Sequence, residues 1–139
     1  MEDLKPVYIV SLGPGEAGLI SLIGGATLCR ANAIFCPKTN ARSRSSVLLK
    51  ELKIKKESIR RYTLPMSKKR EMAYEAYDKV FEEIVSLYSE GLCVAIVAEG
   101  DAGFYSSTSY MVGKLKKVGI PIKQIAGVPA VIAAAASIG

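Results

Sequence analysis

The sequence predicts one α/β domain in three layers, with a doubly wound, mostly parallel sheet of five strands between two layers of helices. Two observations predict this class. Short runs of branched and aromatic residues alternate with segments whose apolar residues recur at helical spacing, which is typical of parallel α/β sheets. The chain has 139 residues, half of them hydrophobic, which suits a single domain with one packed core.

The first half of the chain is predicted to hold two strands and two helices. Residues 7–12 form a run of branched and aromatic side chains that is typical of a buried strand. A helical pattern follows over residues 20–30. Residues 33–36 form the second strand, which we expect Pro37 to end because proline has no N–H to donate. Residues 43–52 then form a short helix.

The second half continues the alternation. A short third strand is predicted at residues 60–64, before Pro65. A long helix begins at an N-cap, Ser67, and ends before Gly91, a residue that favours helix termination. The remaining elements are a strand at 93–98, a helix at 107–118, a strand at 120–125 and an alanine-rich helix at 130–138.

Composition excludes several classes of function. The chain has no histidine, which removes Ser-His and Cys-His nucleophile pairs and the usual zinc sites, so no metal site is predicted. The net charge of +6 favours acidic partners such as phosphates or polycarboxylates. Nucleic acid is disfavoured because the basic residues are scattered over loops without interleaved aromatic residues.

Cysteine usage and hydropathy indicate a cytoplasmic protein without a membrane partner. Three cysteines without metal-ligand spacing point to a reducing compartment. No apolar run is long enough to cross a bilayer, and the first five residues do not resemble a signal peptide. Cys29 and Cys93 fall in apolar patterns and are predicted to be core residues. Cys36 ends a strand, where it either packs in the core or lines a cleft.

Residues 98–107 are the stretch around which the rest is organised. They join a buried strand to a helix and contain Asp101, two glycines and two serines. Ligands of parallel α/β sheets bind at the carboxyl ends of strands, where free N–H groups and glycines let a ligand approach the main chain. The alternative is a simple turn in which Asp101 caps the following helix.

The first loop has the glycine spacing of a dinucleotide-binding turn, since residues 13–18 read G-x-G-x-x-G between a strand and a helix. Three details argue against that function. Pro14 has no N–H for a pyrophosphate, and Glu16 places a negative charge where phosphates would lie. The acid that would hold a ribose is absent, because no Asp or Glu lies between Glu16 and Glu51. A rigid loop held close to another ligand is the better interpretation, while Gly18 also fits a tight turn.

Three motifs carry a more specific resemblance. Residues 11–16 read Ser-Leu-Gly-Pro-Gly-Glu, residues 99–102 read Glu-Gly-Asp-Ala, and residues 126–130 read Ala-Gly-Val-Pro-Ala. In this order and spacing they resemble the tetrapyrrole methylase family, whose members use S-adenosylmethionine (SAM) and whose motifs are Gly-x-Gly-Pro-Gly-Asp, Gly-Asp-Pro and Pro-Gly-Val-x-Ala. The chain departs from them at Glu16, Ala102 and Ala126, where the family has Asp, Pro and Pro.

The resemblance implies a domain organisation and a reaction. Family members carry a second α/β domain, with SAM in the cleft between the two, so residues 1–139 are expected to be the N-terminal domain and to be inactive alone. Residues 104–110, Pro37-Lys38 with the serines after it, and residues 65–67 resemble the members that methylate C20 of precorrin-2, or its cobalt form cobalt-factor II, in cobalamin synthesis. The alternatives are methylation of precorrin-3B or uroporphyrinogen III, or an inactive binding module that assembles through its uncovered cleft.

The resemblance also implies site residues. The residues that would hold SAM are Pro14, Glu99, Gly100, Asp101, Phe104, Pro129 and Ala130. The residues that would bind a reduced tetrapyrrole, which carries many carboxylates, are Lys38, Arg42, Arg44, Tyr105 and Ser106. Glu16 is the candidate catalytic residue, as a proton acceptor or a partner of a pyrrole N–H. The alternatives without a role in ligand binding are core packing for the aromatic residues and solvation for the charged ones. A homodimer is expected, and the basic run from Lys53 to Arg61 is expected to be solvated on the opposite side.

Overall fold

The computed structural model of the chain describes residues 4–38, 44–63, 70–103 and 108–139. Its centre is one five-stranded sheet in the order β3-β2-β4-β1-β5, in which every pair of neighbouring strands is parallel. The strands are β1 (Val7–Ser11), β2 (Ala33–Lys38), β3 (Ile59–Thr63), β4 (Val94–Ala98) and β5 (Ile122–Ile125). The predicted α/β class is confirmed.

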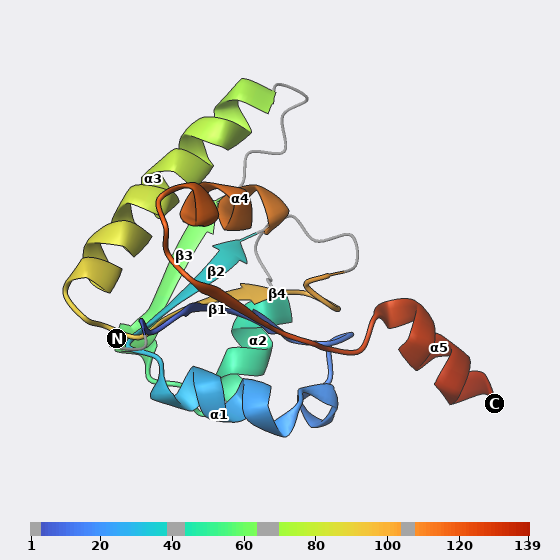
Figure 1. Ribbon diagram of the computed structural model, residues 1–139. Coiled ribbons are helices and arrows are strands. Elements are labelled where there is room, and N and C mark those ends of the chain that lie inside the picture. The colour runs from blue at the N-terminus through green and yellow to red at the C-terminus, as the bar shows by residue number, and fades with distance from the viewer. Residues whose placement is uncertain (1–3, 39–43, 64–69, 104–107) are drawn as a thin grey trace.

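Four helices cover the two faces of the sheet. One face carries α1 (Leu22–Arg30) and α2 (Arg44–Glu51), and the other carries α3 (Arg70–Ser89) and α4 (Ser109–Lys117), as Figure 1 shows. The chain therefore leaves β1 toward one face and β4 toward the other. Since β1 and β4 are neighbours, their carboxyl ends form the topological switch point at which open α/β sheets bind ligands.

The core lies in two layers because successive side chains of a strand point to opposite faces. Ile9 and Ile96 pack with α3 and α4, whereas Val10 and Val97 pack with α1 and α2. β4 is buried along its whole length, as its continuous apolar sequence predicts for a central parallel strand.

The layer of α3 and α4 is joined by aromatic and charged contacts. The rings of Tyr77 and Tyr110 lie 5.5 Å apart between their centroids. Lys114 forms an ion pair with Asp78 of α3 and lies 4.5 Å from the centroid of the Phe81 ring. These contacts fix α4, the helix that follows the stretch at residues 98–107.

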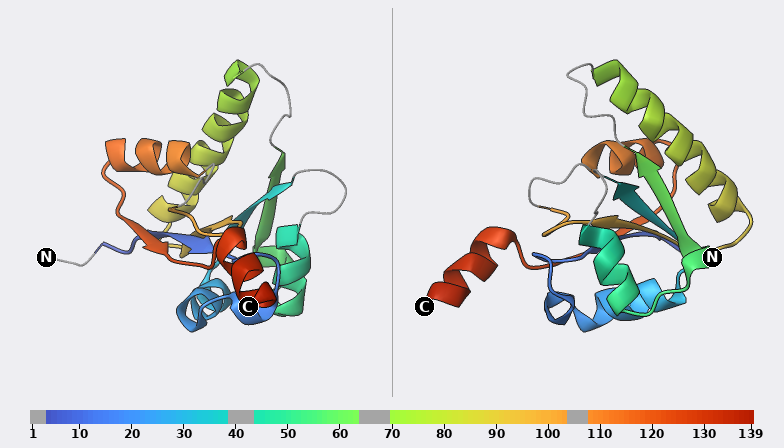
Figure 2. Two further views of the ribbon diagram at one scale, coloured as in Figure 1. Left: turned by 90° about the vertical axis from the view of Figure 1, so that its right-hand side faces the viewer. Right: turned by 180° about the vertical axis from the view of Figure 1, so that it is seen from behind.

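Two short 3₁₀ turns and a fifth helix complete the fold. The turns are η1 (Ala17–Leu19) and η2 (Lys56–Ser58), and the last helix is α5 (Ala130–Ile138). α5 buries none of its residues, and Figures 1 and 2 show it projecting away from the sheet. No helix in the described ranges is long and apolar enough to cross a membrane.

The structure corrects two local predictions. β2 does not end before Pro37 but continues to Lys38. Its pairing with β4 ends at Phe35, while its pairing with β3 continues through Pro37, so proline lies where the strand has one neighbour only. Cys29 is exposed and not a core residue, because α1 turns other positions toward the sheet. Cys36 is buried, which supports packing, and Cys93 is half-buried. The predicted N-cap Ser67 lies outside the described residues.

Candidate functional site

The loops after β1 and β4 are joined by main-chain hydrogen bonds beyond the ends of the strands. The amide of Gly13 donates to the carbonyl of Gly100 at 3.0 Å, and the amide of Gly100 donates back at 2.8 Å. Both glycines have a positive φ, +75° and +66°, which residues with a side chain rarely adopt. The two predicted motif loops are therefore one rigid unit, and this unit requires glycine at both positions.

Asp101 fastens a third loop to this unit. Its Oδ1 accepts a hydrogen bond from the amide of Gly127, after β5, at 2.8 Å, and its Oδ2 accepts one from the amide of Gly103 at 2.9 Å. The alternative that Asp101 caps the following helix is wrong, because α4 begins at Ser109 and the residue at its N-cap position is Thr108. A carboxylate that accepts from two loops holds the site together.

Ser11 makes a similar connection from the end of β1. Its hydroxyl accepts a hydrogen bond from the amide of Ala102 at 2.8 Å, and Ser11 is fully buried. Ser11 belongs to the first motif but is assigned no role from the sequence, because a single serine at the end of an apolar run does not indicate a hydrogen-bond partner.

Gly127 is the position at which the three loops approach most closely. A Cβ atom there would lie 2.5 Å from the Cβ of Ser11 and 2.7 Å from the carbonyl oxygen of Gly100. Gly18 has no such constraint, since a Cβ atom there would meet nothing within 4 Å and its φ is not positive. The tight turn considered for Gly18 therefore does not require glycine at that position.

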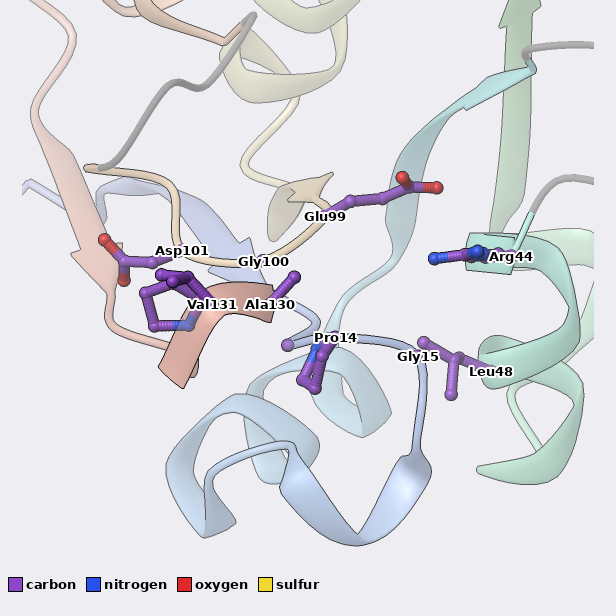
Figure 3. A pocket seen from close by; sticks show the side chains of 11 residues that line it. Pro14, Gly15, Arg44, Leu48, Glu99, Gly100, Asp101, Ala130 and Val131 are labelled. Atoms are coloured by element: carbon purple, nitrogen blue, oxygen red, sulfur yellow. The ribbon is translucent and has the colours of Figure 1, made fainter. Parts of the chain in front are cut away.

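A cavity of about 310 Å³ lies where these loops meet (Figure 3). It is lined by Gly13, Pro14, Gly15, Arg44, Leu48, Glu99, Gly100, Asp101, Pro129, Ala130 and Val131. Five segments contribute to it: the loops after β1, β4 and β5, the helix α2 and the start of α5. Much of the wall is main chain or apolar side chain.

Two charged side chains stand at one end of the cavity. In Figure 3 the carboxylate of Glu99 and the guanidinium of Arg44 point toward the same space, while Asp101 points the other way. The hydroxyl of buried Ser45 donates to Glu99 Oε1 over 3.5 Å. No ion pair joins Glu99 to Arg44, so this space offers a ligand one negative and one positive group.

A second hollow of about 320 Å³ adjoins the cavity on the side of α2. It shares Pro14, Gly15 and Arg44 with the cavity and is also lined by Glu16 and Val47. Arg44 therefore borders both spaces, and a ligand that contacted it would reach from one into the other.

The structure brings most of the predicted cofactor residues together. Pro14, Glu99, Gly100, Asp101, Pro129 and Ala130 all line the cavity, together with Arg44. Glu16 lies in the adjoining hollow, and Lys38 is exposed at the end of β2 and lines neither space. The predictions at Phe104, Arg42, Tyr105 and Ser106 lie outside the described residues. Among the described residues, no group of three or more acidic or cysteine side chains is placed to hold a metal ion.

Sequence reasoning missed Leu48 and Val131, which line the cavity from α2 and α5. Each lies in a helical pattern in which an apolar residue predicts core packing, so their pattern gave no signal of a site.

Comparison with known proteins identifies the family of the chain. The model of the tetrapyrrole (corrin/porphyrin) methylases matches residues 6–139. The chain belongs to this family. It is 28% identical over 137 residues to a protein of Methanocaldococcus jannaschii named "Probable cobalt-precorrin-2 C(20)-methyltransferase", a match that covers 97% of this chain and 58% of that protein.

Solved structures of the family show the same fold. The cobalt precorrin-4 methyltransferase CbiF matches with a TM-score of 0.72 and 24% identity, over 94% of this chain and 49% of its own. The uroporphyrin III C-methyltransferase of Thermus thermophilus matches with a TM-score of 0.68 and 19% identity, over 93% of this chain and 51% of its own. The chain thus spans about half the length of these methylases.

Proposed function

We propose that this chain is the N-terminal domain of a SAM-dependent methyltransferase that methylates C20 of precorrin-2 or of cobalt-factor II. The observation that carries the proposal is the cavity at the carboxyl edge of the sheet, in which the loops after β1, β4 and β5 meet, because these are the loops with the family's motifs. The similarity to the M. jannaschii protein supports the choice of C20, since that match extends over almost the whole chain.

The residues of the cavity fit SAM as a ligand. About 310 Å³ is at the lower end of the range for small-molecule sites, as expected for one wall of a cleft. Pro14 and Val131 offer apolar contacts, and Gly100 lets a ligand approach the main chain. Glu99 supplies a negative charge for the sulfonium or ammonium group. SAM, when bound, supplies a methyl group on a positively charged sulfur, which is a good leaving group.

The chemical task of the protein is then alignment. C20 of the reduced tetrapyrrole is an electron-rich, enamine-like carbon that would attack the methyl group of bound SAM: a carbon–carbon bond would form, the carbon–sulfur bond would break and C20 would lose a proton. Holding two reactants in line contributes about 7–11 kcal/mol to lowering such a barrier. The clamped loops provide a wall that does not need to reorganise. Glu16, exposed in the adjoining hollow, is the candidate acceptor for the proton or for a pyrrole N–H.

Arg44 is proposed to bind a carboxylate of the tetrapyrrole. It borders both the cavity and the adjoining hollow, so a substrate held there lies next to the cofactor. A guanidinium binds a carboxylate through two parallel N–H donors, which fixes orientation as well as position. Lys38 lies at the end of β2, at the same edge of the sheet, and remains a proposal of the same kind. So does Arg42, which lies outside the described residues.

The proposal includes a cytoplasmic location and a homodimer, and α5 supports the homodimer. Val131, Ile132 and Ile138 are 61%, 58% and 87% exposed on this apolar helix. Large apolar side chains in one exposed group are typical of a surface that another protein unit covers. This observation also supports the second candidate function, a domain that binds or assembles without turnover by itself.

Filling the cavity tests the proposal. Replacing Ala130 by Trp places an indole ring on the cavity wall, whereas Trp at Ala136 of the same helix lies outside it. We expect saturation-transfer NMR to detect weak binding of S-adenosylhomocysteine to the parent chain and to Ala136→Trp, and none to Ala130→Trp. Absence of binding to the parent chain, or equal binding by both variants, would contradict the proposal. Product analysis with precorrin-2, cobalt-factor II, precorrin-3B and uroporphyrinogen III, after addition of the C-terminal domain, identifies the substrate.

A further inference from the structure

We propose a second ligand site, for a small polyanion with phosphate groups or clustered carboxylates, at the opposite edge of the sheet. A second cavity of about 310 Å³ lies there, at the amino ends of β2 and β3. It is lined by Leu28, Cys29, Arg30, Ala31, Asn32, Lys53, Ile54, Lys55 and Ser58. None of these residues lines the cavity at the carboxyl edge, so this inference does not rest on the proposed methyltransferase function.

The charges around this cavity have one sign. Arg30 ends α1, and Lys53 and Lys55 belong to the connection between α2 and η2, so two separate segments bring three cations to one hollow. No acidic side chain is among the described residues that line it, and the nearby acids Glu51 and Glu57 are exposed outside it. Arg30 donates to the hydroxyl of Thr27 over 3.5 Å, but no acidic side chain among the described residues pairs with the three cations. Like charges gathered in this way repel each other, and an anion between them removes that repulsion.

Polar groups at the cavity add hydrogen-bond donors. The Oδ1 atom of Asn32 accepts a hydrogen bond from the amide of Cys93 at 2.8 Å, so the group that Asn32 can offer a ligand is its Nδ2 donor. Ser58 contributes a hydroxyl. Oxyanions need such donors in addition to positive charge, because each oxygen accepts two or three hydrogen bonds.

The backbone of Lys53 is the second, independent observation. Lys53 has φ +58° and is the one residue other than glycine with a positive φ among the described residues. Its amide donates to the carbonyl of Lys50, and the amide of Ile54 donates to the carbonyl of Leu49, which is the Schellman pattern that ends α2. Glycine is the usual residue at this position, and any other residue strains the backbone. A lysine kept in a strained conformation at the wall of a basic cavity points to a role for its charge.

The shape of the site favours a small ligand over a nucleic acid. A nucleic acid would need an extended basic surface with aromatic side chains for its bases. Here the cations surround a hollow, and no aromatic side chain is among the described residues that line it. The negative charge of the ligand can come from phosphate groups or from clustered carboxylates. Pyrophosphate represents the first source and citrate the second.

The test uses amide chemical shifts of the full 139-residue chain at about 150 mM salt, where long-range attraction is largely screened. We expect pyrophosphate, citrate or both to shift the amides of residues 29–32 and 53–58 in a saturable way. Lys53→Gly should weaken this binding about fivefold or more while raising the melting temperature by about 2–4 °C, since glycine relieves the strain. Lys56→Gln is the matched control, because it removes an equal charge from a residue of η2 that does not line the cavity.

Lys53→Gly is expected to lower the affinity for the anion and to raise the melting temperature. Because these effects have opposite signs, weaker binding cannot be explained by a loss of folded protein. A variant that gains thermal stability while it loses the anion has lost a binding group and not its structure. The proposal is overturned if neither anion gives saturable shifts at these residues. It is also overturned if Lys56→Gln weakens binding as much as Lys53→Gly, because the attraction would then be a general effect of net charge. Binding of only one anion supports the proposal and identifies its source.

Discussion

The two edges of the sheet are built in different ways. At the carboxyl edge the cavity wall is largely main chain, and its loops are tied together by paired glycines and by the side chains of Asp101 and Ser11. At the amino edge the cavity is surrounded by exposed cations from the end of α1 and from the connection between α2 and η2. Ligand binding at the carboxyl edge is expected to depend on the geometry of the main chain, whereas binding at the amino edge is expected to depend on charge. Substitutions at the carboxyl edge should therefore change stability and binding together, and those at the amino edge should separate them.

Gly127→Ala should have the largest effect. The new methyl group would lie within 3 Å of Ser11 and of the main chain at Gly100, neither of which can move without disturbing the loops. Such overpacking destabilises by about 1–3 kcal/mol, which urea unfolding measures. Binding of S-adenosylhomocysteine should be lost as well.

Gly113→Ala in α4 is the control, because a Cβ atom there meets nothing within 4 Å, and it should stabilise by about 0.5–1 kcal/mol. Equal stability of the two variants would contradict this account of the three loops.

Asp101→Ala should have the next largest effect. It leaves the amides of Gly103 and Gly127 without the acceptor they have now, and we expect a loss of about 2 kcal/mol in the free energy of unfolding. Asp101→Asn should lose about half as much, because its one carbonyl oxygen can still accept from Gly127. If Asp101→Ala abolished binding with no change in stability, the carboxylate would act on the ligand directly and not through the turn.

Lys53→Gly should have the smallest effect on stability, and the opposite sign. The strain of a non-glycine residue in the left-handed conformation is about 1 kcal/mol, and glycine removes it. A destabilised variant would show that Lys53 holds the connection in place and would remove the contrast between the two edges.

Much of the fold could be predicted from the sequence because it depends on strong local signals. The buried parallel strands are continuous apolar runs, and the three motifs lie at their carboxyl ends, where the sheet topology brings them together. The resemblance that these motifs carry implied most of the residues that line the cavity, but not Leu48 and Val131.

The remaining features depend on pairings that the sequence does not reveal. Pro37 is tolerated in β2 because β4 stops pairing before it, and strand register is a tertiary property. Gly127, and not Gly18, is the crowded glycine because two distant loops meet there. Cys29 is exposed because the short helix α1 buries only one narrow side. The basic run after α2 predicts a solvated surface. Only the structure shows that Arg30 lines the same cavity as Lys53 and Lys55.

Titration of the ¹⁵N-labelled chain with S-adenosylhomocysteine, followed by amide shifts, tests the central claim most directly. The account predicts saturable shifts at Gly13, Gly15, Gly100 and Gly127, because the carboxyl edge presents its main chain to the ligand. It predicts no shifts at residues 29–32 and 53–58 of the amino edge. Saturable shifts at the amino edge alone, or none at either edge up to millimolar ligand, would contradict it.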